Sequence, residues 1–316
     1  MKRRTFLKDM AVGSLLATGP FSWAFSKGKK TENLPVPKRP LSDTGEMLSM
    51  IGFGSILLRD NGHQFANETV AKAIDAGINY FDVAPTYGNA EEMLGPALEP
   101  YRKDCFLACK TGQWDKKKAE EELNASLKKL RTDHFDLYQL HAISSKEDVD
   151  KALGSRGAIE LFEKAKKEGK IRYTGFSAHS EEAALYAMEN YHFDTILFPL
   201  NFVCWYRGQF GPKAYAKARE KKMGILAIKA MAKTRRDKEQ DKRYKNIWYQ
   251  PIENMSLSDK ALRFTLSKDI TAAIPPGDSK FLFRAIEHAS KYATLTNKED
   301  AYLQDIAKVT EPIFKT

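Results

Sequence analysis

Four side chains suited to proton transfer lie in the first half of the chain: Asp82, Tyr87, Lys110 and His141. The ordinary pKa of tyrosine, about 10, is too high for easy proton exchange at neutral pH. A lysine ammonium nearby favours the phenolate and lowers that pKa, and an aspartate holds the ammonium charged and in place. A histidine close to both can donate a hydrogen bond to a carbonyl oxygen. Brought together, the four residues predict a general acid and an electrophilic clamp for reducing a C=O group by hydride.

Three of these residues, Asp82, Lys110 and His141, each come directly after a short, mainly apolar run. A charged residue that closes an apolar strand is costly to place unless another group pairs with it. Further polar residues hold the corresponding positions after later runs: Ser177, His179, Asn201 and Lys229. Several such residues that converge on one edge of a sheet favour a functional site there.

Eight β-like runs alternate with amphipathic helical patterns, which is typical of βαβ units around a parallel sheet. The predicted strands are Met50–Gly54, Asn79–Val83, Cys105–Lys110, Phe135–Leu140, Ile171–Phe176, Thr195–Leu200, Ile225–Lys229 and Thr271–Ile274. Eight repeats in a chain of 316 residues predict an α/β fold, a single (β/α)₈ TIM barrel with a helical tail at Asn297–Thr316. A doubly wound sheet is the rival, but the Gly52-Phe53-Gly54 sequence has no third glycine in the expected place.

Three stretches then resemble the aldo-keto reductase family across nearly the whole chain after residue 40. Ile78–Gly95 resembles the family signature, Ser126–Asp133 with the strand that ends at His141 resembles a second motif, and Leu41–Gly54 resembles the N-terminal β-hairpin and first strand. The resemblance implies that Asp82, Tyr87, Lys110 and His141 form the catalytic tetrad, with Tyr87 as proton donor. It also implies NADP(H) as the usual source of hydride.

The cofactor-binding positions match the family less well. Ala178 follows Ser177 where the family commonly has asparagine, and Leu197 stands where it often has glutamine. Asp278 is a poor neighbour for a 2′-phosphate because like charges repel, although Lys280 or Arg284 could compensate, so NADP(H) is favoured only slightly over NAD(H). The expected cofactor-binding residues are Gly54, Ser177, Asn201, Lys229, Ile274, Gly277, Ser279 and Lys280.

Residues 1–26 have the plan of an export signal peptide: basic residues, an apolar stretch, then small residues. Arg3-Arg4 followed by Phe6-Leu7-Lys8 resembles a twin-arginine signal in particular. The apolar stretch is too short and too interrupted for a permanent membrane anchor. The sequence therefore predicts a signal at 1–26, a linker at 27–40 and a barrel at 41–316, with the export machinery as a partner and a periplasmic or otherwise exported location.

The composition and net charge exclude few classes of protein, but they limit the kinds of binding partner that are expected. The formal net charge is +10, and part of it lies in residues 1–26 and in the basic stretch Lys233–Lys245. That stretch has no motif for nucleic acid and is interpreted as a solvated loop, so no nucleic-acid partner is expected. The three cysteines, Cys105, Cys109 and Cys204, suit neither a disulfide framework nor a metal cluster and are expected to be buried free thiols.

The first functional hypothesis is an exported oxidoreductase that transfers hydride between a nicotinamide cofactor and a small carbonyl or alcohol compound, such as an aldehyde, ketone or sugar. An alternative is a catalytically weak or non-catalytic barrel that acts as a periplasmic binding protein. A metal-assisted hydrolase is disfavoured because the histidines lack a recognisable ligand spacing, and no metal site is expected. Candidate aromatic residues for the substrate pocket are Trp114, Phe202, Trp205 and Tyr206. The loop Met231–Gln250, which contains Trp248 and Tyr249, is a candidate cover for the site.

Overall fold

The computed structural model describes residues 34–236 and 243–316. Within them, eight strands pair in parallel in the order β12-β9-β8-β7-β6-β5-β4-β3. They are β3 (Phe53–Gly54), β4 (Tyr80–Asp82), β5 (Phe106–Thr111), β6 (Phe135–Ile143), β7 (Ile171–Ala178), β8 (Thr195–Pro199), β9 (Gly224–Ile228) and β12 (Ala272–Ile274). Each predicted strand is confirmed to within a few residues.

The sheet closes on itself just before β3. Ile51 forms a parallel bridge with Ala273 of β12, supported by hydrogen bonds from Gly52 N to Ala273 O at 3.0 Å and from Ala273 N to Met50 O at 2.9 Å. These bonds join the first and last strands, so the prediction of a (β/α)₈ barrel is confirmed.

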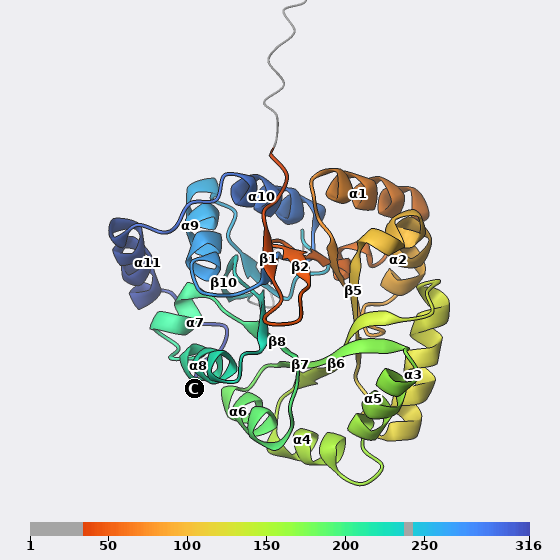
Figure 1. The fold of residues 1–316 in the computed structure, drawn as a ribbon. Coiled ribbons are helices and arrows are strands. Elements are labelled where there is room, and N and C mark those ends of the chain that lie inside the picture. Colours follow the sequence, from red (N-terminus) through yellow and green to blue (C-terminus); the bar gives the residue numbers. More distant parts are fainter. Residues whose placement is uncertain (1–33, 237–242) are drawn as a thin grey trace, which may run out of the picture. The chain divides into compact units, whose positions relative to one another are not determined.

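Helices form a ring around these strands in Figure 1. They are α1 (His63–Asp75), α2 (Ala90–Leu98), α3 (Lys116–Lys129), α4 (Lys146–Leu153), α5 (Ala158–Lys167), α6 (Glu181–Asn190), α7 (Phe202–Tyr206), α8 (Pro212–Glu220), α9 (Met255–Leu266), α10 (Ser279–Ser290) and α11 (Asn297–Val309), with 3₁₀ turns η1 (Ser55–Leu58) and η2 (Glu99–Asp104). Side-chain caps define several starts: Asp115 accepts from Lys118 N at α3, and Ser145 completes a capping box at α4.

The predicted C-terminal helix is confirmed as α11, which ends at Val309. The sequence pattern predicts a buried face of Ala301, Ile306 and Val309, and the observed face differs from it. Leu303 and Ala307 are buried against α7 and α9, whereas Ala301 and Val309 are exposed. A helix covers its neighbour with residues three or four apart, and the packing of α11 selects Leu303 and Ala307 rather than the set chosen from the pattern.

An antiparallel hairpin lies at the amino ends of the barrel strands. It consists of β1 (Lys38–Pro40) and β2 (Met47–Ser49), so its first strand lies inside the segment predicted as a linker. Leu41 and Leu48 are buried in the same cluster as the inward-facing barrel residues. A second hairpin, β10 (Ala232–Arg235) with β11 (Tyr249–Pro251), follows β9.

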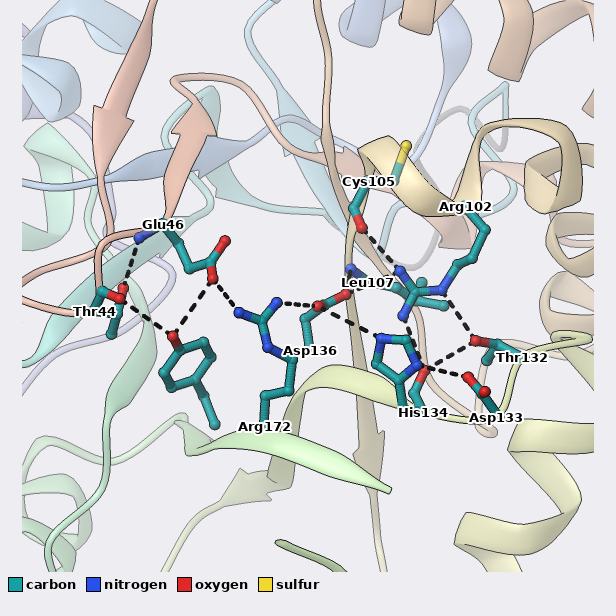
Figure 2. Close-up of polar contacts among 11 residues, drawn as sticks. Thr44, Glu46, Arg102, Cys105, Leu107, Thr132, Asp133, His134, Asp136 and Arg172 are labelled. Atoms are coloured by element: carbon teal, nitrogen blue, oxygen red, sulfur yellow. Dashed lines mark hydrogen bonds and ion pairs between the residues drawn. The ribbon is translucent and has the colours of Figure 1, made fainter. Parts of the chain in front are cut away.

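An ionic network ties the strand starts together beside the first hairpin (Figure 2). The buried Asp136 carboxylate of β6 pairs with Arg102 at 3.0 Å and with Arg172 at 2.7 Å, and it accepts a hydrogen bond from Leu107 N at 2.8 Å. Arg172 also pairs with Glu46 of the hairpin loop. One buried carboxylate therefore connects η2, three strands and the hairpin.

We expect Asp136→Ala to lower the free energy of unfolding by about 3 kcal/mol, the lower end of the range for breaking a buried ion pair, because the arginines left behind are partly exposed. Urea denaturation monitored by circular dichroism measures this change. Asp133→Ala is the matched control, since the Asp133 side chain is 94% exposed, and it is expected to change stability by less than about 0.5 kcal/mol. Equal stabilities of the two variants would contradict the role of Asp136.

Candidate active site

A cavity of about 260 Å³ opens at the carboxyl ends of the barrel strands, and Asp82, Tyr87 and His141 line it. This is the end at which barrel enzymes build their sites from the loops that follow the strands. A larger hollow, of about 930 Å³, lies at the opposite end beside the ionic network. The principal ionic groups there are paired with one another, so we interpret that end as stabilising the fold. The smaller cavity is therefore the candidate site.

The centre of the site is an ion pair that is almost completely buried. Lys110 of β5 contacts the Asp82 carboxylate of β4, and both side chains are at most 3% exposed. Lys110 Nζ also donates to the backbone oxygen of Val83 at 3.1 Å and lies 3.4 Å from the Tyr87 hydroxyl. The structure thus brings three of the four predicted catalytic residues into direct contact.

The pKa of Tyr87 does not move in the direction expected from its neighbour alone. Burial raises this pKa above its ordinary value, and the Lys110 ammonium offsets only part of the increase. The Lys110 charge acts on this pKa in the expected direction, but desolvation of the phenolate outweighs it, so the net shift is upward. Burial alone would lower the pKa of Lys110, but the Asp82 carboxylate raises it, so Lys110 stays charged and Tyr87 stays protonated.

His141, the fourth predicted residue, faces Tyr87 across the cavity. The two rings meet edge to face, with centroids 5.8 Å apart, and the Thr86 hydroxyl lies 3.4 Å from His141 Nδ1. Burial, with the positive charges of Lys110 and Lys229 and with His179, lowers the pKa of His141 to about 3. In the tautomer whose Nδ1 accepts the hydrogen bond from Thr86, the neutral ring carries its proton on Nε2, where it can be donated to a carbonyl oxygen.

Five of the eight expected cofactor-binding residues line the cavity: Gly54, Ser177, Lys229, Ile274 and Gly277. At Gly277 an added Cβ would lie 2.7 Å from Ile56 Cγ2, so the close approach of the backbone requires glycine. The Ser177 hydroxyl accepts a hydrogen bond from Ala142 N at 2.7 Å, in the irregular end of β6. Ser177 therefore also holds the backbone beside His141.

The other three expected cofactor-binding residues, Asn201, Ser279 and Lys280, do not line the cavity. Asn201 is buried, caps α7, and donates to the backbone oxygens of Lys229 and Ala232 at 3.0 and 2.6 Å. Ser279 is the first residue of α10, which Asp278 caps. Lys280 Nζ donates to the Tyr244 hydroxyl at 2.9 Å. The Asn201 side chain thus supports the segment that carries Lys229.

Lys229 has an unusual setting within the cavity. Its backbone adopts a positive φ of 68°, a strained conformation for a residue with a side chain. Its Nζ lies 5.3 and 5.1 Å from the ring centroids of Trp248 and Tyr249. Burial, with a contribution from the Lys110 charge, lowers the pKa of Lys229 to about 8. An anionic group entering the cavity would meet this ammonium.

Two aromatic residues of the cavity, Trp248 and Tyr249, come from the loop predicted to cover the site, whereas the four aromatics expected to line the pocket lie elsewhere. Phe202, Trp205 and Tyr206 pack in the cluster of α7, α9 and α11. Trp114 packs against the main core. A strand-end position in the sequence does not fix which way a loop side chain turns, and tertiary packing directs these aromatics away from the mouth.

Gln139 is a polar residue that the sequence interpretation missed. It is fully buried on β6, and its Nε2 donates to Asp82 Oδ2 at 3.3 Å. The signal was available, because Gln139 is polar and lies two positions before His141, so the two side chains face the same side of the strand.

A parallel eight-stranded barrel with an Asp–Lys–Tyr–His group at its carboxyl ends defines a class of α/β barrel proteins equipped for proton transfer. A sequence model of the aldo/keto reductase family matches residues 50–280. The chain belongs to this family of oxidoreductases, whose members use nicotinamide cofactors.

Individual relatives match only part of the chain. The chain is 37% identical over 155 residues to the uncharacterized oxidoreductase YqkF of Bacillus subtilis, and this alignment covers 45% of this chain and 48% of that protein. It is 30% identical over 166 residues to L-galactose dehydrogenase of Arabidopsis thaliana, and this alignment covers 48% of this chain and 51% of that protein. The chain thus spans about half the length of the curated relatives it matches.

The fold has a close match among solved structures. The holo form of the aldo-keto reductase AKR11C1 from Bacillus halodurans aligns with a TM-score of 0.68 at 22% identity, covering 87% of this chain and 98% of that one. This likeness confirms the barrel fold.

The buried histidines predict a pH dependence of stability. Burial lowers the pKa of His141 to about 3 and, together with Lys229, the pKa of His179 to about 4, whereas an unfolded histidine titrates near pH 6.5, at about its ordinary value. Below that pH the unfolded state binds more protons, so the free energy of unfolding falls as the pH drops from about 6.5 to about 4.

One histidine changes the free energy of unfolding by at most about 1.4 kcal/mol per pH unit, and by less after solvent screening. We expect His179→Asn to show a shallower fall than the wild type in urea denaturation between these pH values. The same slope in both proteins would contradict the burial of an uncharged His179.

Proposed function

We propose that the protein reduces carbonyl compounds, or oxidises the corresponding alcohols, with a nicotinamide cofactor. The contact of Lys110 with both Asp82 and the Tyr87 hydroxyl, at the edge of a cavity that His141 also lines, is the observation that carries this proposal. A binding protein has no need of a buried lysine held against a tyrosine hydroxyl. This arrangement therefore favours the enzyme over the alternative of a non-catalytic barrel.

Each member of the tetrad has a distinct role in this proposal. His141 donates a hydrogen bond from Nε2 to the substrate oxygen, which orients the carbonyl and polarises it. The Tyr87 hydroxyl gives its proton to that oxygen as negative charge develops there. The Lys110 ammonium stabilises the phenolate left on Tyr87, and Asp82 keeps Lys110 charged and in position.

The cavity has features that fit a nicotinamide nucleotide, which when bound supplies the hydride for carbonyl reduction. Gly277 brings the backbone close to the cavity wall, and Leu197, Ile228 and Ile274 provide apolar surface there. The Lys229 ammonium offers positive charge to an anionic group. For the phosphorylated cofactor, Lys280 lies beyond the cavity with its Nζ 3.5 Å from the Glu253 carboxylate, and Asp278 disfavours a nearby phosphate, so we propose only a slight preference for NADP(H).

We expect Tyr87→Phe to lower kcat for reduction of an aldehyde such as 4-nitrobenzaldehyde by about 10²- to 10⁴-fold, the usual range for loss of a general acid. The dissociation constants of NADPH and NADH, followed by tryptophan fluorescence, should change by less than about twofold because the phenyl ring remains.

Tyr101→Phe, outside the cavity, is the control and should retain wild-type kcat. Full activity of Tyr87→Phe would exclude Tyr87 as the proton donor. Failure of the folded wild type to bind either nucleotide at millimolar concentration would favour the binding-protein alternative, and the ratio of the two affinities measures the cofactor preference.

We also propose that the protein is exported through a twin-arginine-type signal. The support is the order of basic, apolar and small residues in 1–26, which lie outside the described residues. Within 34–236 and 243–316, no helix has the length and apolar character needed to cross a membrane.

Replacing Arg3 and Arg4 together by lysine is expected to leave the protein in the cytoplasm, since the arginine pair is the feature that this signal type requires. Fractionation of cells, with immunoblotting of the soluble fractions, measures the distribution. The same distribution for variant and wild type would exclude this route.

A further inference from the structure

A fully buried amide lies directly beneath the tetrad. Gln139 and His141 are two residues apart on β6, so both side chains point into the barrel. Gln139 Nε2 donates to Asp82 Oδ2, whereas Lys110 contacts the other carboxylate oxygen, Oδ1. The amide and the ammonium therefore hold the two oxygens of one carboxylate from different sides.

Packing alone does not explain a glutamine at this position. Its Oε1 is buried and has no hydrogen-bond partner among the described residues. A buried acceptor without a partner is unfavourable, whereas a leucine of similar size would fill the space without that cost. The neighbouring inward-facing residues Tyr80, Leu137 and Leu197 belong to a mainly apolar cluster. The polar group is kept where an apolar one would fit, which points to a role at Asp82.

The surroundings of Asp82 show what that role is. Tyr80, two residues before Asp82 on β4, is also fully buried. The Asp82 carboxylate contributes to the raised pKa of Tyr80, after burial, but the Tyr80 hydroxyl makes no hydrogen bond of acceptable geometry within the described residues. By hydrogen-bond geometry, the side-chain donor to Asp82 Oδ2 in the described part of the chain is Gln139 Nε2, at 3.3 Å. Without it, the carboxylate could turn about its terminal bond and Lys110 would lose its fixed partner.

We propose that Gln139 is a positioning residue for proton transfer, which fixes the Asp82 carboxylate so that Lys110 is held against the Tyr87 hydroxyl. The inference rests on the proposed reductase function. The contacts run from Gln139 Nε2 to Asp82, from Asp82 to Lys110 Nζ, and from Lys110 Nζ to the Tyr87 hydroxyl, the last over 3.4 Å. Gln139 does not line the cavity, so it acts through these residues and not on the substrate.

The first test is Gln139→Leu, which keeps the size of the side chain and removes the donor. We expect kcat for 4-nitrobenzaldehyde with NADPH to fall by about 10-fold or more, the effect of losing a hydrogen bond to a charged group. KM and the dissociation constant of NADPH should stay within about twofold of the wild type. The melting temperature should stay the same or rise, since the unpartnered Oε1 is gone.

Leu137→Met is the matched control. Leu137 is inward-facing on the same strand, two residues before Gln139, and is fully buried. The exchange conserves volume and should leave kcat unchanged. If Gln139 only supported the fold, the melting temperature of Gln139→Leu would fall together with kcat.

A second variant, Gln139→Glu, tests the hydrogen bond by pH. When protonated, the new carboxyl donates to Asp82 as the amide does; when ionised, it repels Asp82, and this repulsion raises the pKa that the two carboxyls share above the ordinary range. We therefore expect kcat relative to the wild type to be near one at low pH and to fall at least 10-fold as the pH rises to 8. Gln139→Leu has no such group and should show a pH-independent ratio.

The possible outcomes distinguish a failure of the role of Gln139 from a failure of the proposed reductase function. A wild type that reduces no carbonyl compound with either nucleotide overturns both. An active wild type with Gln139→Leu within twofold of its kcat, or with a loss of kcat matched by a lower melting temperature, overturns the inference alone. A pH-independent ratio for Gln139→Glu also overturns it.

Discussion

The buried pair of Asp82 and Lys110 is the constraint on which the site depends. Neither charge is stable in this position without the other, because burial of a lone ion costs several kcal/mol, on the order of the stability of a domain. The two residues come from the ends of β4 and β5, whose register pairs Asp82 with Ala108. Closure of the barrel in this register therefore places the pair, and the pair fixes the charge of Lys110 beside Tyr87.

The two ends of the barrel use charge in different ways. At the amino ends of the strands, Glu46, Arg102, Asp136 and Arg172 satisfy one another and connect the hairpin to the strands. At the carboxyl ends, the Lys229 ammonium lies against aromatic rings and forms no ion pair within the described part of the chain. Its positive charge helps to keep His141 neutral. The ion pairs at the amino ends stabilise the fold, and the unpaired positive charge at the carboxyl ends is suited to binding an anionic group.

The predictions that succeeded rest on local patterns that tertiary packing has little freedom to alter. An apolar run closed by Asp82, Lys110 or His141 becomes a strand whose last side chain faces the barrel mouth, and parallel strands bring such ends together. The pocket aromatics and the full set of cofactor residues were harder to predict. A side chain that follows a strand end, such as Trp205, can turn toward the core or the mouth, and the packing of α7, α9 and α11 turns Trp205 toward the core.

The sequence by itself determined the strand order, the barrel, and the group of Asp82, Tyr87, Lys110 and His141 at its mouth, because alternation along a strand and parallel pairing leave few other arrangements. Only the tertiary structure decided their electrostatic states. The neighbouring lysine alone predicts a lowered pKa for Tyr87, but burial raises it, and burial depends on every element packed around the site. The same holds for Gln139: its inward position follows from the strand period, but its contact with Asp82 requires the closed barrel.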